Sequence, residues 1–313
     1  MLQSLYLGTS IAISWAWGTS LILGMQIAQT KGLEAFLIWA TANCLTLALF
    51  GFLYHRKFLN PLVLDQPVVR VFTNLIQIFC LIIQLKILNE TLLSFFNPTS
   101  SYMIASGTGL FLTLLMFQKG LKASIFTDLW QGLLTILGLS MMVYLCMGIP
   151  STPSPTSSVS DISWGIWSAV ILLSGIMTDI QHWQRAKVDQ TQKAFYCASV
   201  FFAIYLSLVY VLSLYKFDNL LNLLLLFVVI GVTTSTIDSI AVALHRDFGR
   251  KLGTLIGLSI CIGYGLLLKL SVLSIWSYFG VIRVGLALYI LYWCYKHEVN
   301  NRTTNNSLSQ IPS

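Results

Sequence analysis

The segment 233–239, which reads TTSTIDS, has the residue types of a site for a small cation. It places five hydroxyl groups and one carboxylate inside an otherwise apolar run. In a helix Ser235, Asp238 and Ser239 share a face, because they are three and four residues apart. Hydroxyl and carboxylate oxygens with modest total charge suit a small, hard cation. The simpler alternative is that the hydroxyls bond back to carbonyls in the preceding turn of the helix.

A second carboxylate, Asp128, lies in the segment 120–132, GLKASIFTDLWQG, and we expect it at a depth similar to that of Asp238. An ionisable side chain inside a membrane helix is costly and is a functional candidate. Two such carboxylates could hold a cation between them, relay protons, or form an aspartyl protease dyad. We reject the protease, and expect no enzyme, because neither Asp is flanked by that class's glycine-rich motif and no other nucleophile–base pair occurs. For Asp238, a salt bridge to Arg246 or a water-exposed vestibule is the simpler alternative.

The histidines and cysteines show no metal-ligand spacing. We expect all four histidines in or near cytoplasmic loops, which argues against a zinc-type site. The six cysteines lie in apolar runs without a CxxC pair, which is typical of small, buried hydrophobic residues in the reduced state. The histidines are His55, His182, His245 and His297, and the cysteines are Cys44, Cys80, Cys146, Cys197, Cys261 and Cys294.

The composition indicates a membrane protein. Of 313 residues, 56% are hydrophobic and 9% are charged, whereas about 25% are charged in a soluble domain. Apolar runs of about 20 residues recur, and each is long enough to cross a bilayer as a helix. The runs are continuous rather than alternating, which excludes a transmembrane barrel. We predict ten spanning helices, none of them a cleaved signal peptide, at residues 4–28, 31–54, 66–88, 98–118, 121–148, 162–184, 193–216, 219–246, 251–270 and 274–296.

The net charge of +7 predicts an orientation in the bilayer rather than a nucleic-acid partner. Lysine and arginine concentrate in alternate connections, and by the positive-inside rule these connections face the cytoplasm. Both termini are then cytoplasmic, in a multi-pass protein of the plasma membrane (the inner membrane if the cell is bacterial). The Pro/Ser-rich segment 150–161 becomes a flexible external loop, and the polar tail 299–313 is expected to be disordered. The cytoplasmic basic residues are Arg56, Lys57, Lys119, Lys122, Arg185, Lys187, Lys193, Arg246, Arg250 and Lys251.

The external loop divides one transmembrane core, residues 1–298, into two sets of five helices, at 1–149 and 162–298. An odd number of helices per half forces opposite orientations, as in transporters built from inverted repeats. In such transporters the first helix of each half is broken near mid-membrane. The first helix here has Gly, Thr and Ser at 18–20, and the sixth has Ser and Gly at 174–175. These residues weaken a helix and can leave carbonyls free as cation ligands, although they also serve close helix packing.

Several stretches resemble motifs of the sodium:solute symporter family. GLKASIFTDLWQG resembles that family's GGLKAVxWTDxxQG signature, and SWAWGTSLILG followed by GLEAF resembles its first core helix. TDIQHWQRA (178–186) resembles its DQxxWQRA stretch. TSTIDS resembles its STxDS motif, and RDF (246–248) resembles its arginine–aspartate–aromatic ending. The motifs follow the family's order across residues 14–248, and we expect a ten-helix core without the extra helices that members commonly carry around it.

The resemblance implies an all-α transmembrane fold, the LeuT-type 5+5 inverted-repeat bundle of ten helices, with Na⁺ as the coupling ion. The family's main sodium site uses carbonyls of the broken first helix and of helix 8, together with two adjacent hydroxyls. Carried over residue by residue, the carbonyls are those of Ser14, Trp17 and Val232, and the hydroxyls are those of Ser235 and Thr236. A second cation site, found in some members, would use Asp128, Ser235, Asp238 and Ser239.

The function so implied is sodium-coupled import of a small organic solute by alternating access, with solute, sodium and the lipid bilayer as partners. The alternative is a non-transporting or sensory relative that binds solute or cation and signals through a partner subunit. Arg283, inside the tenth predicted helix, could neutralise an anionic substrate, snorkel outward, or pair with a lipid headgroup. The candidate substrate residues, for each of which helix packing is the simpler alternative, are Trp15, Thr19, Ser20, Asn74, Gln77 and Ser174.

Overall fold

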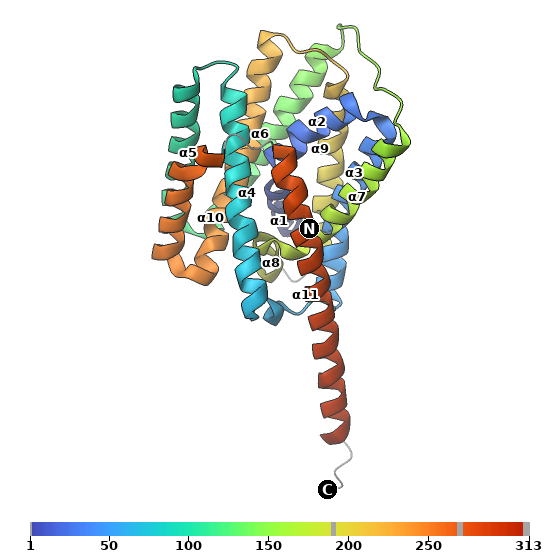
Figure 1. The fold of residues 1–313 in the computed structure, drawn as a ribbon, viewed down its shortest axis with the longest axis vertical. Helices are drawn as coiled ribbons and strands as arrows, with labels where there is room; N and C mark the ends of the chain where they lie inside the picture. Colours follow the sequence, from blue (N-terminus) through green and yellow to red (C-terminus); the bar gives the residue numbers. More distant parts are fainter. Residues whose placement is uncertain (1, 189–191, 268–271, 309–313) are drawn as a thin grey trace.

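The computed structural model describes residues 2–188, 192–267 and 272–308, and over these ranges the chain is helical, without a strand (Figure 1). Within these ranges eight helices are long and apolar enough to cross a membrane, or up to nine spans if one sharply bent pair forms a single span. The predicted class, a helical multi-pass membrane protein, agrees with this architecture.

The bent pair is the first predicted helix, which is broken at its centre. α1 (Leu2–Trp15) and α2 (Gly18–Thr30) meet at an angle of 64°. The break falls immediately before the small residues at 18–20 that predicted it. A Cβ on Gly18 would lie 2.7 Å from Cγ2 of Thr233, so the glycine lets this break approach the polar stretch of another helix.

The sixth predicted helix is also interrupted. α7 (Val159–Gly175) ends at the predicted weak point, a single 3₁₀ turn follows (Ile176–Thr178), and α8 (Ile180–Val188) begins after an extended residue, Asp179. α7 begins three residues earlier than predicted, because Ser158 and Asp161 form a capping box ahead of the apolar run.

The eighth and ninth predicted helices are two arms of one element, α10 (Asn219–Gly263). The chain reverses at Gly249, which has φ 71° and ψ 165°. Nε2 of His245 lies 3.0 Å from Oγ1 of Thr254, and nine residues of straight helix would instead separate such groups by about 13 Å. The reversal falls between the predicted boundaries at 246 and 251.

The reversal gives a first testable prediction. The Gly249 dihedral angles lie in a region that is essentially open to glycine alone, and occupying it costs other residues about 1–3 kcal/mol. Gly249→Ala should therefore lower the free energy of unfolding by that amount, although no atom within 4 Å would clash with the new methyl group. Gly107→Ala is the matched control, because Gly107 is exposed within α5 and an alanine there should stabilise by about 0.5–1 kcal/mol. Equal effects of the two substitutions in detergent unfolding would contradict the strained turn.

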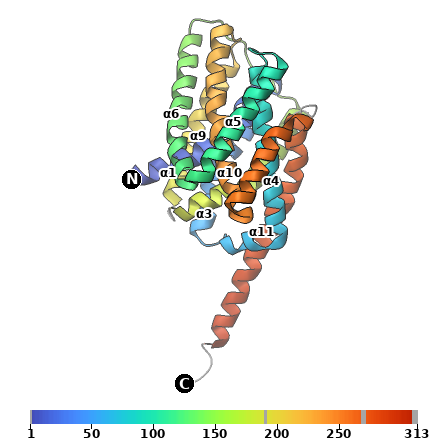
Figure 2. The same cartoon turned by 90° about the vertical axis from the view of Figure 1, so that its left-hand side faces the viewer.

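The remaining elements lie within a few residues of their predicted positions. The exception is α11 (Val272–Leu308), which continues past the predicted end at 296 because its polar end contains neither proline nor glycine after Gly285. The tail predicted to be disordered is thus helical to 308, and Figures 1 and 2 show this end projecting from the bundle as a single helix. The other helices are α3 (Gly32–His55), α4 (Pro67–Leu92), α5 (Pro98–Lys119), α6 (Leu121–Cys146) and α9 (Gln192–Ser213), with 3₁₀ turns at Pro61–Asp65 and Tyr264–Leu267.

The connections gather at two ends of the bundle. At one end Lys31 pairs with Asp161 at 3.0 Å, and the backbone N–H of Thr152 donates to the carbonyl of Leu214 at 2.7 Å. The segment 150–161, predicted to be a flexible loop, is therefore anchored to its neighbouring connections. At the other end lie the 3₁₀ turn before α4 and the Gly249 reversal, joined by an ion pair between Arg246 and Asp65 at 2.7 Å.

Candidate functional site

Four helices meet at a fully buried polar cluster around Asp128 of α6. One carboxylate oxygen accepts a hydrogen bond from Oγ of Ser235 in α10 at 2.5 Å. The other accepts from Oγ of Ser10 in α1 at 2.5 Å and pairs with Nη2 of Arg185 in α8 at 2.7 Å. The prediction that the hydroxyl stretch of α10 lies beside Asp128 agrees with this geometry.

The sequence predicts Arg185 in a loop between two helices, and this position is wrong. It lies in α8, its side chain is 0% exposed, and its guanidinium occupies the centre of the cluster. Besides the carboxylate of Asp128, it donates to Oγ of Ser239 at 2.8 Å and to Oγ of Ser10 at 2.9 Å. α8 is fixed by Trp183, which is buried and donates its indole N–H to the carbonyl of Met177 at 2.9 Å.

The second carboxylate, Asp238, is held by three hydroxyl groups. It accepts hydrogen bonds from Ser124 at 2.7 Å, from Thr127 at 2.8 Å and from the neighbouring Ser239 at 3.2 Å. The salt bridge to Arg246 considered above is not formed, since that arginine pairs with Asp65 at the end of the bundle. With both carboxylates ionised, the cluster has two negative charges and one positive charge.

The residues predicted to form the main sodium site come from α1 (Ser14), from the α1–α2 break (Trp17) and from α10 (Val232, Ser235 and Thr236), and α1 contacts α10. Oγ1 of Thr236 donates to the carbonyl of Val232 at 3.0 Å, which is the back-bonding geometry of a hydroxyl in a helix. The carbonyl of Ser14 accepts the indole N–H of Trp17 at 3.0 Å. The carbonyl of Trp17 accepts the N–H groups that begin α2. The three predicted carbonyl ligands therefore accept hydrogen bonds from protein donors in this conformation, and the two predicted hydroxyl ligands donate to protein acceptors.

One histidine also lies elsewhere than predicted. His182 is 0% exposed and meets the ring of Trp15 edge-on, with centroids 5.2 Å apart. Its Nε2 lies 3.7 Å from a carboxylate oxygen of Asp179 at the α7–α8 break. The same carboxylate accepts hydrogen bonds from Gln77 at 3.0 Å and from Gln181 at 2.6 Å. Within the ranges given above, no three His, Cys, Asp or Glu side chains come together as metal ligands.

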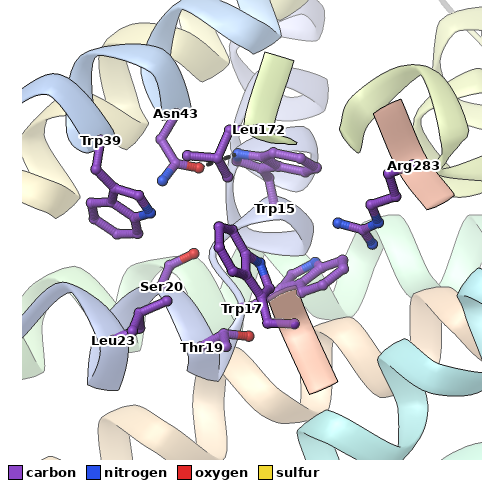
Figure 3. A pocket seen from close by; sticks show the side chains of 10 residues that line it. Trp15, Trp17, Thr19, Ser20, Leu23, Trp39, Asn43, Leu172 and Arg283 are labelled. Atoms are coloured by element: carbon purple, nitrogen blue, oxygen red, sulfur yellow. Dashed lines mark hydrogen bonds between the residues drawn. The ribbon is translucent and has the colours of Figure 1, made fainter. Parts of the chain in front are cut away.

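A small cavity lies at the α1–α2 break, and Figure 3 shows side chains from several helices pointing toward it. Its volume is about 20 Å³, which is enough for a water molecule or two. The indole N–H of Trp15 donates to Oδ1 of Asn43 across it at 3.2 Å (Figure 3). The lining residues are Trp15, Trp17, Thr19, Ser20, Leu23, Trp39, Asn43, Leu172, Trp276 and Arg283.

Three of the six predicted substrate residues, Trp15, Thr19 and Ser20, line this cavity, and the other three have different partners. Asn74 donates to the carboxylate of Asp247 at 2.7 Å, and Gln77 donates to Asp179 at the α7–α8 break. Ser174 bonds back to the carbonyl of Val170 within α7. The lining residues that sequence reasoning did not select include Trp39 and Asn43, four positions apart in α3, and this spacing on one helix face was the available signal.

The fold and site define a helical membrane protein with two broken helices, a buried ion-pair cluster, and a cavity at one of the breaks. Comparison of the chain with models of known protein families finds no match, and comparison with curated proteins finds no related sequence.

Proposed function

We propose that this chain is a sodium-coupled symporter that imports a small organic solute by alternating access. The observation that carries the proposal is the break at 16–17, which adjoins both the polar stretch of α10 and the lined cavity. Discontinuous helices beside a buried site are the structural signature of ion-coupled transporters. The interrupted α7–α8 segment supports the same reading, as does the resemblance to the sodium:solute symporter family.

In the proposed mechanism Na⁺ binds between α1 and α10, through the carbonyls of Ser14, Trp17 and Val232 and the hydroxyls of Ser235 and Thr236. Because Trp17 also lines the cavity through its side chain, sodium binding would fix the geometry of the solute site. The two ligands then bind with positive coupling, and the coupling must be reciprocal. Sodium entering down its gradient would thereby drive the solute inward.

The cluster around Asp128 and Asp238 supports a second cation or proton. A buried group with net charge −1 is unfavourable unless something neutralises it. Arg185 occupies the position between Asp128 and Ser239, so a second cation would bind nearer to Asp238. A proton on Asp238 is the alternative, and the two differ in whether transport responds to sodium or to pH.

Alternating access would proceed in the LeuT-type manner, with two inverted sets of five helices rocking around the broken ones, and with both termini in the cytoplasm. A larger hollow of about 400 Å³ supports an outer route to the cavity. It shares Thr19 and Leu23 with the cavity and extends past Gln26 and Glu90 toward the end where the anchored loop lies.

The direct test is uptake from a mixture of small organic solutes by cells that express the protein, read by mass spectrometry in sodium and in potassium media. Symport predicts that one solute or chemical series accumulates in sodium alone, and that Ser235→Ala/Thr236→Ala abolishes this accumulation. Solute binding to purified protein without accumulation would instead favour the alternative, a sensory relative that signals through a partner. Accumulation that is equal in sodium and potassium would contradict sodium coupling.

A further inference from the structure

Arg283 of α11 is a buried arginine without a carboxylate partner. Its side chain is 5% exposed, and Nε is buried without a hydrogen-bond partner. Nη2 contacts Sγ of Cys80 at 3.1 Å, and the guanidinium lies 5.0 Å from the ring centroid of Trp17. Among the side chains that the structure describes, no acidic oxygen lies within the 4.0 Å of an ion pair with it. Its guanidinium points into the cavity (Figure 3).

Comparison with Arg185 shows which partners the guanidinium of Arg283 lacks. That guanidinium has a carboxylate and two hydroxyl groups within 3 Å. Asp179, the acidic residue at the end of the α7 segment, is bonded to the amides of Gln77 and Gln181 rather than to Arg283. A buried cation without a directly paired anion is unfavourable, so an anion bound against Arg283 would stabilise it.

The surroundings of Arg283 support the cation only in part. A Cβ on Gly175 would lie 3.4 Å from Nη1, so the glycine admits the guanidinium to the carboxyl-terminal end of α7, where the helix dipole favours positive charge. The face of the Trp17 indole adds a cation–π contact. Neither feature supplies acceptor oxygens for the parallel N–H groups of the guanidinium. The spacing of these groups matches the two oxygens of a carboxylate.

The other residues that line the cavity indicate the chemistry of the rest of an anion bound to Arg283. Four indoles, from Trp15, Trp17, Trp39 and Trp276, line it together with two leucines. Arg283 supplies the only full charge among the lining residues, all of which the structure describes. An ammonium group would find no counter-charge here, whereas an apolar body would be enclosed by aromatic rings.

We propose that this cavity binds a small organic monocarboxylate, with Arg283 pairing the carboxylate and the indoles enclosing its body. The proposal rests on the proposed function, in which this cavity is the solute site. The present space of about 20 Å³ is too small for such a molecule, so binding must displace the indoles. The tryptophan fluorescence of the wild-type protein should therefore change when the carboxylate binds.

The test uses the purified full-length protein in sodium buffer and a panel of monocarboxylates from acetate to benzoate, each compared with its uncharged amide. Tryptophan fluorescence and thermal unfolding are read for the wild type, Arg283→Gln, Arg283→Lys and the control Arg250→Gln, which alters an exposed arginine. We expect at least one carboxylate to change the fluorescence and raise the unfolding midpoint, while its amide does neither. Arg283→Gln should weaken that binding at least tenfold, Arg283→Lys should weaken it less, and Arg250→Gln should leave it unchanged.

Three results would overturn the proposal: no carboxylate binds the wild type, each amide binds as well as its acid, or chloride at equal concentration acts like the carboxylates. The wild-type fluorescence decides the first two even if the Arg283 variants fail to fold. Repeating the titration in potassium separates the two proposals. Carboxylate binding that needs Arg283 but not sodium would retain this inference and reject sodium coupling. A sodium-dependent shift without carboxylate binding would do the reverse.

Discussion

Replacing Arg185 with methionine should lower the free energy of unfolding by about 3–5 kcal/mol, because it leaves buried carboxylates without their cation. Asp128 would lose its ion pair of 2.7 Å, and its negative charge would remain close to that of Asp238. Unfolding in mixed detergent micelles, followed by circular dichroism, measures the change. Lys187→Met is the matched control, because Lys187 is exposed in the same short helix, and it should change stability by less than about 0.5 kcal/mol.

A double-mutant cycle isolates the pair itself. Replacing a buried ion pair with apolar residues of similar volume is often close to neutral, so Arg185→Met/Asp128→Leu should be more stable than Arg185→Met alone. The coupling energy is expected to reach about 0.5–3 kcal/mol, the range for residues in one network. If the free energy of unfolding of the double variant fell by the sum of the two single changes, Arg185 and Asp128 would not act as a unit. If Arg185→Met matched Lys187→Met, the cluster would not form as described.

Sodium should stabilise the wild-type protein, and Ser235→Ala/Thr236→Ala should abolish that stabilisation. A specific ligand at about 100 times its dissociation constant contributes about 2.7 kcal/mol to the free energy of unfolding. The measurement is thermal unfolding while sodium replaces potassium at constant ionic strength, which holds screening of surface charges fixed. The expected result is a rise in the wild-type midpoint with sodium and a flat response in the double variant.

The control for the loss of sodium stabilisation is a second double substitution in the same helix, α10. Thr233→Ala/Thr234→Ala removes as many hydroxyls from residues outside the predicted ligand set, and both of these bond back to helix carbonyls as Thr236 does. That variant should be less stable in both salts yet keep the sodium response. A wild-type midpoint that is equal in sodium and potassium would reject the first sodium site. Proton coupling through Asp128 and Asp238, or a core that does not transport, would then become the leading explanation.

The helix breaks could be predicted because their causes are local. Small residues at 18–20 and 174–175 weaken a helix wherever they stand, and both α-helical segments are interrupted within a few residues of them. The closeness of Asp128 to the hydroxyl stretch of α10 followed from depth and from the resemblance. The five-plus-five symmetry, the membrane orientation and the sodium ligands remain predictions.

The charges of the site could not be placed from sequence, because their positions depend on packing between distant segments. Counting lysine and arginine between apolar runs treats Arg185 as a loop residue, although Ile180, Trp183 and Ala186 recur every three positions and signal a buried helix face. Asn74 and Gln77 share a face of α4 but lie one turn apart, so Asn74 bonds Asp247 of α10 and Gln77 bonds Asp179 at the α7–α8 break. The hydropathy of the tenth predicted helix does not indicate whether the side chain of Arg283 points into the bundle or away from it.

Coupled movement of sodium and solute is the property that a symporter must have, and radioactive sodium measures it directly. Proteoliposomes loaded with potassium would be diluted into labelled sodium, with and without a mixture of small organic solutes. We expect the solutes to accelerate sodium entry several-fold in the wild type, and we expect no acceleration in Ser235→Ala/Thr236→Ala. Sodium entry that is indifferent to the solutes, or accelerated equally in the variant, would show that the α1–α10 junction does not couple the two.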